Sequence, residues 1–110
     1  MDIFDAAFSG NIIRVRELLD SGIDINSRGR YGYTPLIVAS YYGNKEIVKM
    51  LLQRNADPDI QNRNGDTALI LASKEGQGDI VRLLLQYNAD PDIRNSYANT
   101  ALNIAEVRDD

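Results

Sequence analysis

The same residue types return every thirty-three positions along this chain, and this repetition constrains its fold more than any single residue does. The recurring positions are Thr34, Thr67 and Thr100; Ala39, Ala72 and Ala105; Gly10, Gly43 and Gly76; and Asp24, Asp57 and Asp90. A period of this length is typical of folds built from stacked repeats, in which each unit buries its apolar face against its neighbours. Such folds leave one long surface free, and that surface usually holds another macromolecule.

Composition argues against several classes of function. The 110 residues are 44% hydrophobic and 25% charged, which is ordinary for one folded domain. The net charge of -4 argues against binding to nucleic-acid phosphates, because such binding needs clustered Lys and Arg. The chain has no Cys and no His, so it lacks thiolate metal ligands and the commonest general base.

The N-terminal residues and the length of the apolar runs indicate where in the cell the protein is expected to be. Residues 1–5 read MDIFD, which is acidic where a signal peptide is basic, and no apolar run approaches the length of a membrane span. We therefore expect no membrane partner and a cytoplasmic location.

The clearest repeat unit predicts two antiparallel helices. Thr34 is a good N-cap and Pro35 suits the first helical position, so a short helix is expected to begin there. Gly43 can end this helix in a left-handed conformation, and Asn44 can cap a second helix over residues 45–54. The apolar positions of the second helix recur at the spacing of one buried face: Ile47, Val48, Leu51 and Leu52.

The segment after the second helix predicts a reversal of the chain. Asn55 and Asn88 stand where Gly22 stands in the first unit, and Gly and Asn are the residues that best tolerate a positive φ at a helix C-terminus. Asn64-Gly65 then indicates a tight, hairpin-like turn. Each unit is therefore expected to return the chain to the start of the next helix pair.

These features together resemble a known repeat family. The block TPLIVASYYGNKEIVKMLLQRNADPD and its copy TALILASKEGQGDIVRLLLQYNADPD are similar to ankyrin repeats, with their turn, short helix, turn, longer helix and loop. The resemblance implies an all-α solenoid of stacked helix-turn-helix units joined by β-turn loops, with about three full repeats and a partial fourth. It divides a single domain, 1–110, into repeats at about 1–28, 29–61 and 62–94 and a partial repeat at 95–110.

Two departures from the family pattern are visible. The His that usually follows Thr-Pro-Leu is replaced by Ile37, Ile70 and Asn103, so the inter-repeat hydrogen bonds that this His supports are not expected. Ala98 replaces the turn glycine found at Gly32 and Gly65, and this predicts a distorted last turn.

The resemblance implies that turn tips and the outward side of each first helix line a concave surface that contacts the partner. The predicted partner-binding residues at these positions are Arg30, Tyr31, Tyr33, Tyr41, Tyr42, Arg63, Asn64, Asp66, Lys74, Glu75 and Tyr97. Phe8, Ser9, Ser96 and Asn99 map to the same surface. Tyr and Arg dominate interface hot spots, although these rings could instead pack against their own neighbours. The other charged members are expected to act as rim contacts.

No motif in the chain predicts catalysis, a metal or a cofactor. Asp57-Pro58-Asp59 opens like a calcium loop, but the loop would need Gly and Glu where the chain has Asn62 and Ala68. Gly76-Gln77-Gly78 follows a predicted helix and lacks the rest of a phosphate-binding motif. We therefore expect no enzyme activity and no small-molecule substrate.

Three functional hypotheses remain open. The leading one is a protein-protein interaction module that binds a protein or peptide through its concave, Tyr-rich face. The second is a structural or self-assembling segment, in which the truncated C-terminal end exposes part of the Leu83, Leu84 and Leu102 neighbourhood and docks to a second copy of the chain, as a homodimer, or to further repeats. The third is a designed binder, which the close likeness of the second and third repeats suggests, although the irregular first repeat favours a natural sequence.

Overall fold

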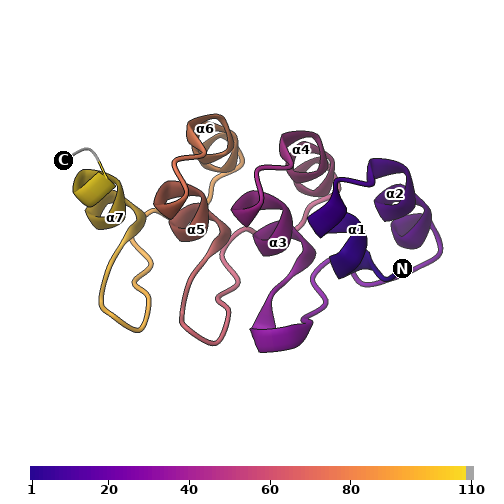
Figure 1. Cartoon of the computed structure of the whole chain (residues 1–110), viewed down its shortest axis with the longest axis horizontal. Coiled ribbons are helices and arrows are strands. Elements are labelled where there is room, and N and C mark those ends of the chain that lie inside the picture. The colour runs from indigo at the N-terminus through magenta and orange to yellow at the C-terminus, as the bar shows by residue number, and fades with distance from the viewer. Residues whose placement is uncertain (109–110) are drawn as a thin grey trace.

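The computed structural model describes residues 1–108. Its helices are α1 (Ile3–Ser9), α2 (Ile12–Asp20), α3 (Pro35–Tyr41), α4 (Lys45–Gln53), α5 (Ala68–Lys74), α6 (Gly78–Gln86) and α7 (Ala101–Arg108), with a short 3-10 turn, η1 (Arg30–Gly32). Helices α1, α3, α5 and α7 form one row, and α2, α4 and α6 form a second row beside it (Figure 1). The predicted all-α solenoid of stacked helix pairs is confirmed.

The predicted start and end of the short helices are confirmed. The Thr34 hydroxyl accepts from the Ile37 N–H at 3.1 Å, and the Thr67 hydroxyl accepts from Ile70 N–H at 3.2 Å. Each threonine thereby satisfies one of the free N–H groups at the helix start. Gly43, two residues after the end of α3, has φ 76° and lets the chain turn into α4.

Asn44 precedes α4 as predicted, but its side chain does not cap that helix. Its amide group instead donates to the carbonyl oxygens of Ala7 and Phe8, at 2.5 and 3.1 Å. These carbonyls belong to the last turn of α1, where the helix itself supplies no partner. The side-chain capping prediction is therefore wrong: Asn44 joins its own repeat to the preceding one.

A hairpin-like turn forms at Asn64-Gly65, as predicted. The Gly65 N–H donates to Asn62 O and the Asn62 N–H donates to Asp66 O, both at 2.9 Å. Neighbouring turn tips are also joined, because Arg63 N–H donates to Tyr31 O at 3.0 Å. The same bond recurs one repeat later, from the Ser96 N–H to Asn64 O at 2.9 Å. The turns thus stack on one another in step with the helices.

This stacking explains the glycine at the turn tip. A Cβ atom on Gly65 would lie 2.9 Å from the backbone nitrogen of Ser96, and one on Gly32 would lie 3.2 Å from that of Arg63. Both residues also have positive φ, at 77° and 76°. Close backbone approach and the left-handed conformation therefore both require glycine at these two tips.

The last turn is not distorted, so the expectation based on Ala98 is wrong. Ala98 takes φ 62°, and its N–H donates to Asn95 O at 2.9 Å, as the N–H of Gly65 does to Asn62 O. Within residues 1–108 no further turn tip follows to stack against Ala98. Its methyl group therefore has room, and the left-handed backbone remains as a strain of about 1–2 kcal/mol.

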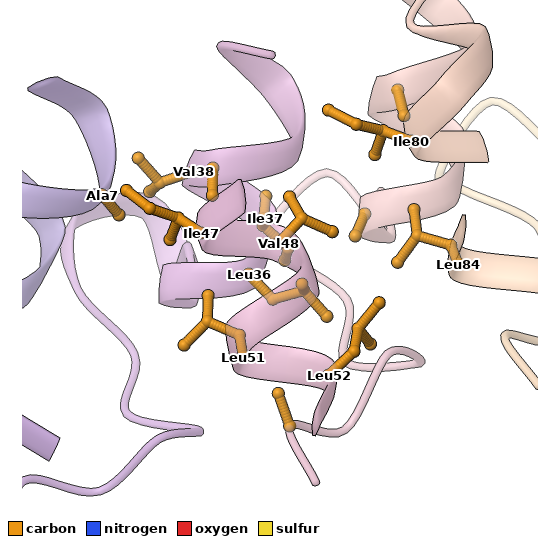
Figure 2. Packing of buried hydrophobic residues seen from close by; sticks show 14 of the residues in the cluster. Ala7, Leu36, Ile37, Val38, Ile47, Val48, Leu51, Leu52, Ile80 and Leu84 are labelled. Carbon is orange, nitrogen blue, oxygen red and sulfur yellow. The ribbon is translucent and has the colours of Figure 1, made fainter. Parts of the chain in front are cut away.

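Apolar side chains fill the space between the two rows. Figure 2 shows Leu36 and Ile37 of α3 among Val48 and Leu51 of α4. Ile37 and Ile70, which stand where the repeats that this chain resembles usually have His, are each 1% exposed. They stabilise the stack by burial rather than by hydrogen bonding, at about 1.5–3 kcal/mol for each fully buried side chain.

The C-terminal end of the stack differs from the expectation. Leu83 and Leu84 are buried, because the face of α6 that carries them packs into the core with α4 and α5. Of the neighbourhood predicted to be exposed in part, these two residues are therefore not exposed. Leu102 of α7 is 63% exposed, as expected, and Leu85 of α6 is partly exposed as well.

The glycine argument predicts opposite effects at two equivalent turn tips. Gly65→Ala is expected to lower the free energy of unfolding by about 2 kcal/mol or more, because it adds left-handed strain and a backbone clash. Ala98→Gly is expected to raise it by about 0.5–1 kcal/mol, because strain is relieved with only a small entropic cost. Urea denaturation of both variants measures these values, and a destabilised Ala98→Gly protein would contradict the argument.

Asn44→Asp separates the two roles considered for this side chain. If Asn44 bonds to α1, the aspartate loses the amide donor and places a carboxylate against two carbonyl oxygens, so stability falls by about 1–2 kcal/mol. Aspartate is a good N-cap, so a side chain that capped α4 would keep its stability in this variant. Thermal unfolding followed by circular dichroism decides between the two, with Asn44→Ala as the reference for simple loss of the side chain.

Candidate partner-binding face

Nine of the eleven predicted binding residues line two hollows at the turn tips and first helices. The first, here called the aromatic hollow, has a volume of about 320 Å³. Its lining contains the predicted residues Arg30, Tyr31, Tyr33 and Tyr42, together with Phe4, Asp5, Phe8 and Val38. The second, here called the amide hollow, has a volume of about 600 Å³. Its lining contains the predicted residues Asn64, Asp66, Lys74, Glu75 and Tyr97, together with Asn95, Asn99, Asn103 and Ile104.

An edge-to-face chain of three rings stands beside the aromatic hollow. The Phe8 and Tyr42 ring centroids are 4.6 Å apart at 88°, and those of Tyr41 and Tyr42 are 4.9 Å apart at 75°. Phe8 and Tyr42 are 55% and 50% exposed, whereas Tyr41 is half-buried against the core. The C-terminal ends of α1 and α3 therefore hold two neighbouring rings in water in a fixed geometry.

Tyr31 projects from the turn tip in an unusual backbone conformation. Its φ is 59°, and with the following Gly32 it makes a left-handed pair at the tip. The ring is 60% exposed, and the Arg63 guanidinium lies 6.0 Å from its centroid. This distance is at the outer limit of a cation–π contact. Arg63 itself lines neither hollow, and it joins the site only through Tyr31.

Tyr33 lies deeper than the other tyrosines of the aromatic hollow. Burial raises the pKa of its phenol above the ordinary value, and the nearby Tyr41, Asp66 and Tyr42 raise it further. The neighbouring Asn62 side chain acts in the opposite direction. The phenol therefore stays protonated at physiological pH and can donate a hydrogen bond to a bound group.

The amide hollow is polar and is held in shape by its own hydrogen bonds. The Asn95 side-chain amide donates to the Asp66 carboxylate at 2.9 Å. The Asn95 side-chain oxygen accepts from the N–H groups of Tyr97 and Asn99, at 2.9 and 3.0 Å. These bonds fix the turn that presents Tyr97, whose side chain is 79% exposed.

Sequence reasoning missed part of the lining of both hollows. Phe4 stands thirty-three residues before Ile37, a buried position, and the repeat period therefore does not place it on the binding surface. Its ring packs on Gly29, where an added Cβ would lie 3.0 Å from it. The positions equivalent to Gly29 in the next two turns are Asn62 and Asn95. The glycine at position 29 was therefore the one signal that a neighbouring side chain occupies this space.

Asp57 and Asp59, whose spacing is that of the start of a calcium loop, have a structural role. The Asp57 carboxylate accepts from Asp59 N–H at 2.9 Å, and the Asp59 carboxylate accepts from Asp90 N–H of the next repeat at 2.8 Å. Among the described residues, no three His, Cys, Asp or Glu side chains gather where they could hold a metal ion. None of the helices in residues 1–108 has the length and apolar character needed to cross a membrane.

Comparison with known proteins identifies the fold family. Residues 18–72 and 53–105 each match the family described as ankyrin repeats in many copies. A segment of 35 residues is 54% identical to the mouse (Mus musculus) ankyrin repeat, SAM and basic leucine zipper domain-containing protein 1. That segment is 32% of this chain but only 7% of the mouse protein. With the two helix rows and stacked turns, the matches across residues 18–105 show that the chain belongs to the ankyrin repeat family.

Proposed function

We propose that this protein is a recognition module that binds a partner protein or peptide through its concave face. Ankyrin repeats generally mediate protein-protein interactions and are typically non-enzymatic. The observation that carries the proposal for this face is the exposed ring pair of Phe8 and Tyr42 at the mouth of the aromatic hollow. Two large rings held half in water have no role in the core, and a partner would bury them.

The residue types on the face support the same function. An exposed Tyr can bury a large ring at little entropic cost and still hydrogen-bond through its hydroxyl, and Tyr31, Tyr42 and Tyr97 are all at least half exposed. Arg30, Arg63, Lys74 and Glu75 would steer the approach of a partner rather than supply most of the affinity. A stable complex would bury roughly 1,200–2,000 Å² of surface in total.

The ring pair can be tested with a matched tyrosine control. Phe8→Ala/Tyr42→Ala is expected to lose a partner that the unchanged chain retains in a pull-down, because each hot-spot ring contributes about 2 kcal/mol or more. Tyr87→Ala removes a partly exposed ring outside both hollows and is expected to keep the partner. Circular dichroism first establishes that both variants fold. Equal capture by all three proteins would show that the concave face is not the site.

Self-association is a second candidate function, supported by the exposed Leu102 and Leu85 at the C-terminal end. If this end docks on a second copy, the mass measured by sedimentation should rise with concentration, and Leu102→Ser should abolish the rise. A constant monomer mass across the concentration series would exclude this mode.

Four expectations from the sequence stay predictions. They are the cytoplasmic location, the absence of a nucleic-acid or small-molecule partner, the repeat boundaries, and the choice between a natural and a designed origin.

A further inference from the structure

The two hollows differ in charge. In the lining of the aromatic hollow, Arg30 balances the one carboxylate, Asp5, and Arg63 adds a cation beside Tyr31, outside that lining. In the amide hollow, the carboxylates of Asp66 and Glu75 stand with one ammonium group, that of Lys74. A partner that lies along the whole face therefore meets an aromatic end with Arg63 at its edge and an acidic, amide-rich end. This polarity favours one direction of binding over the other.

The order of the helices sets the separation of the hollows. The aromatic hollow takes residues from α1 and α3, whereas the amide hollow takes residues from the end of α5 and from α7. These helices follow one another along a single row (Figure 1). Since packed helices lie about 8–10 Å apart, the two hollows are two steps, or roughly 20 Å, from each other. An extended peptide covers that distance with about six residues, at ~3.3 Å each.

The chemistry of the amide hollow suits a peptide backbone. Its lining includes Asn64 and Asn99, whose side-chain amides can both donate and accept hydrogen bonds, as peptide groups do. Asn103 also lines it, and its side-chain oxygen already accepts from the Thr100 N–H at 3.0 Å. The aromatic hollow, in contrast, is bounded by Phe4, Phe8 and Val38 and can bury one apolar side chain. One end of the face is thus suited to anchoring a side chain, and the other to holding an extended segment.

We propose that the concave face takes an extended peptide with two anchors. One apolar side chain fills the aromatic hollow, and a Lys or Arg about six residues away lies against Asp66 and Glu75 in the amide hollow. The proposal rests on the proposed function, because it specifies the partner of the same face. A folded partner that presents no linear segment is the competing occupant.

The test starts from a phage-displayed library of random peptides of about twelve residues, twice the expected spacing, selected on the folded chain. The enriched peptides are expected to share an aromatic or large aliphatic residue and a Lys or Arg about six positions apart. Enrichment of peptides without this pair, or no enrichment at all, would overturn the peptide proposal.

Variants then assign each anchor to its hollow, with fluorescence anisotropy of one enriched peptide as the measurement. Phe8→Ala is expected to weaken binding at least about tenfold, because it removes a hot-spot wall of the aromatic hollow. When the selection is repeated on the Glu75→Lys variant, the enriched peptides should carry an acidic residue in place of the basic one and should keep the apolar anchor. The new lysine sits at the C-terminal end of α5, where a cation suits the helix, so the variant should fold. Tyr87→Ala is the control and should bind as the unchanged chain does.

The outcomes separate the two proposals. If Phe8→Ala weakens binding but Glu75→Lys selects the same basic residue, the amide hollow does not hold the second anchor and the peptide proposal fails, while the concave face remains the site. If both variants bind the peptide as the unchanged chain does, the peptide lies elsewhere, and the proposed function loses its support as well. A partner captured through Phe8 and Tyr42 with no enriched peptide indicates a folded partner.

Discussion

Contact between neighbouring repeats is the interaction on which the rest of this structure depends. Each helix pair packs against its neighbours, α3 against α1 and α5 and α4 against α2 and α6, and residues such as Ala39, Ala72 and Leu51 are fully buried in the stack. The bonds from Asn44 to α1 and from the Arg63 N–H to Tyr31 O tie the same neighbours together through polar groups. A single unit would leave both its apolar face and these polar groups in water, so the repeats are stable only together.

The contact also decides which positions can vary. Glycine is required at positions 32 and 65 because the next turn lies against the tip, and Thr34 and Thr67 are held as helix caps. The residue just before the turn glycine need not be glycine: it is Tyr31, with φ 59°, in one repeat and Asn64 in the next. Chemistry that could recognise a partner is therefore confined to the few positions that stacking leaves free.

Sequence reasoning succeeded where a feature depends on local chemistry. The helix start at Thr34, the left-handed Asn55 and the turn at Asn64-Gly65 each follow from a residue and its immediate neighbours. It failed where another repeat sets the outcome. The side chain of Asn44 donates to a carbonyl oxygen thirty-seven positions earlier, and earlier helices bury Leu83 and Leu84. The candidate site divides in the same way. Its turn-tip residues could be mapped by period, but the ring of Phe4 enters through space that Gly29 leaves open.

The backbone is nearly the same in each repeat, so the chemistry of the face changes only through the side chains at equivalent positions. The ends of α3 and α5 have equivalent positions, yet the first carries Tyr41 and Tyr42 and the second carries Lys74 and Glu75. Since helix axes in contact lie about 8–10 Å apart, the surface passes from aromatic to charged within one repeat. A partner that spans several repeats must match this order of side chains, and one that covers a single repeat meets only part of it. Selectivity in such a protein therefore depends on the sequence of variable positions along a nearly constant scaffold.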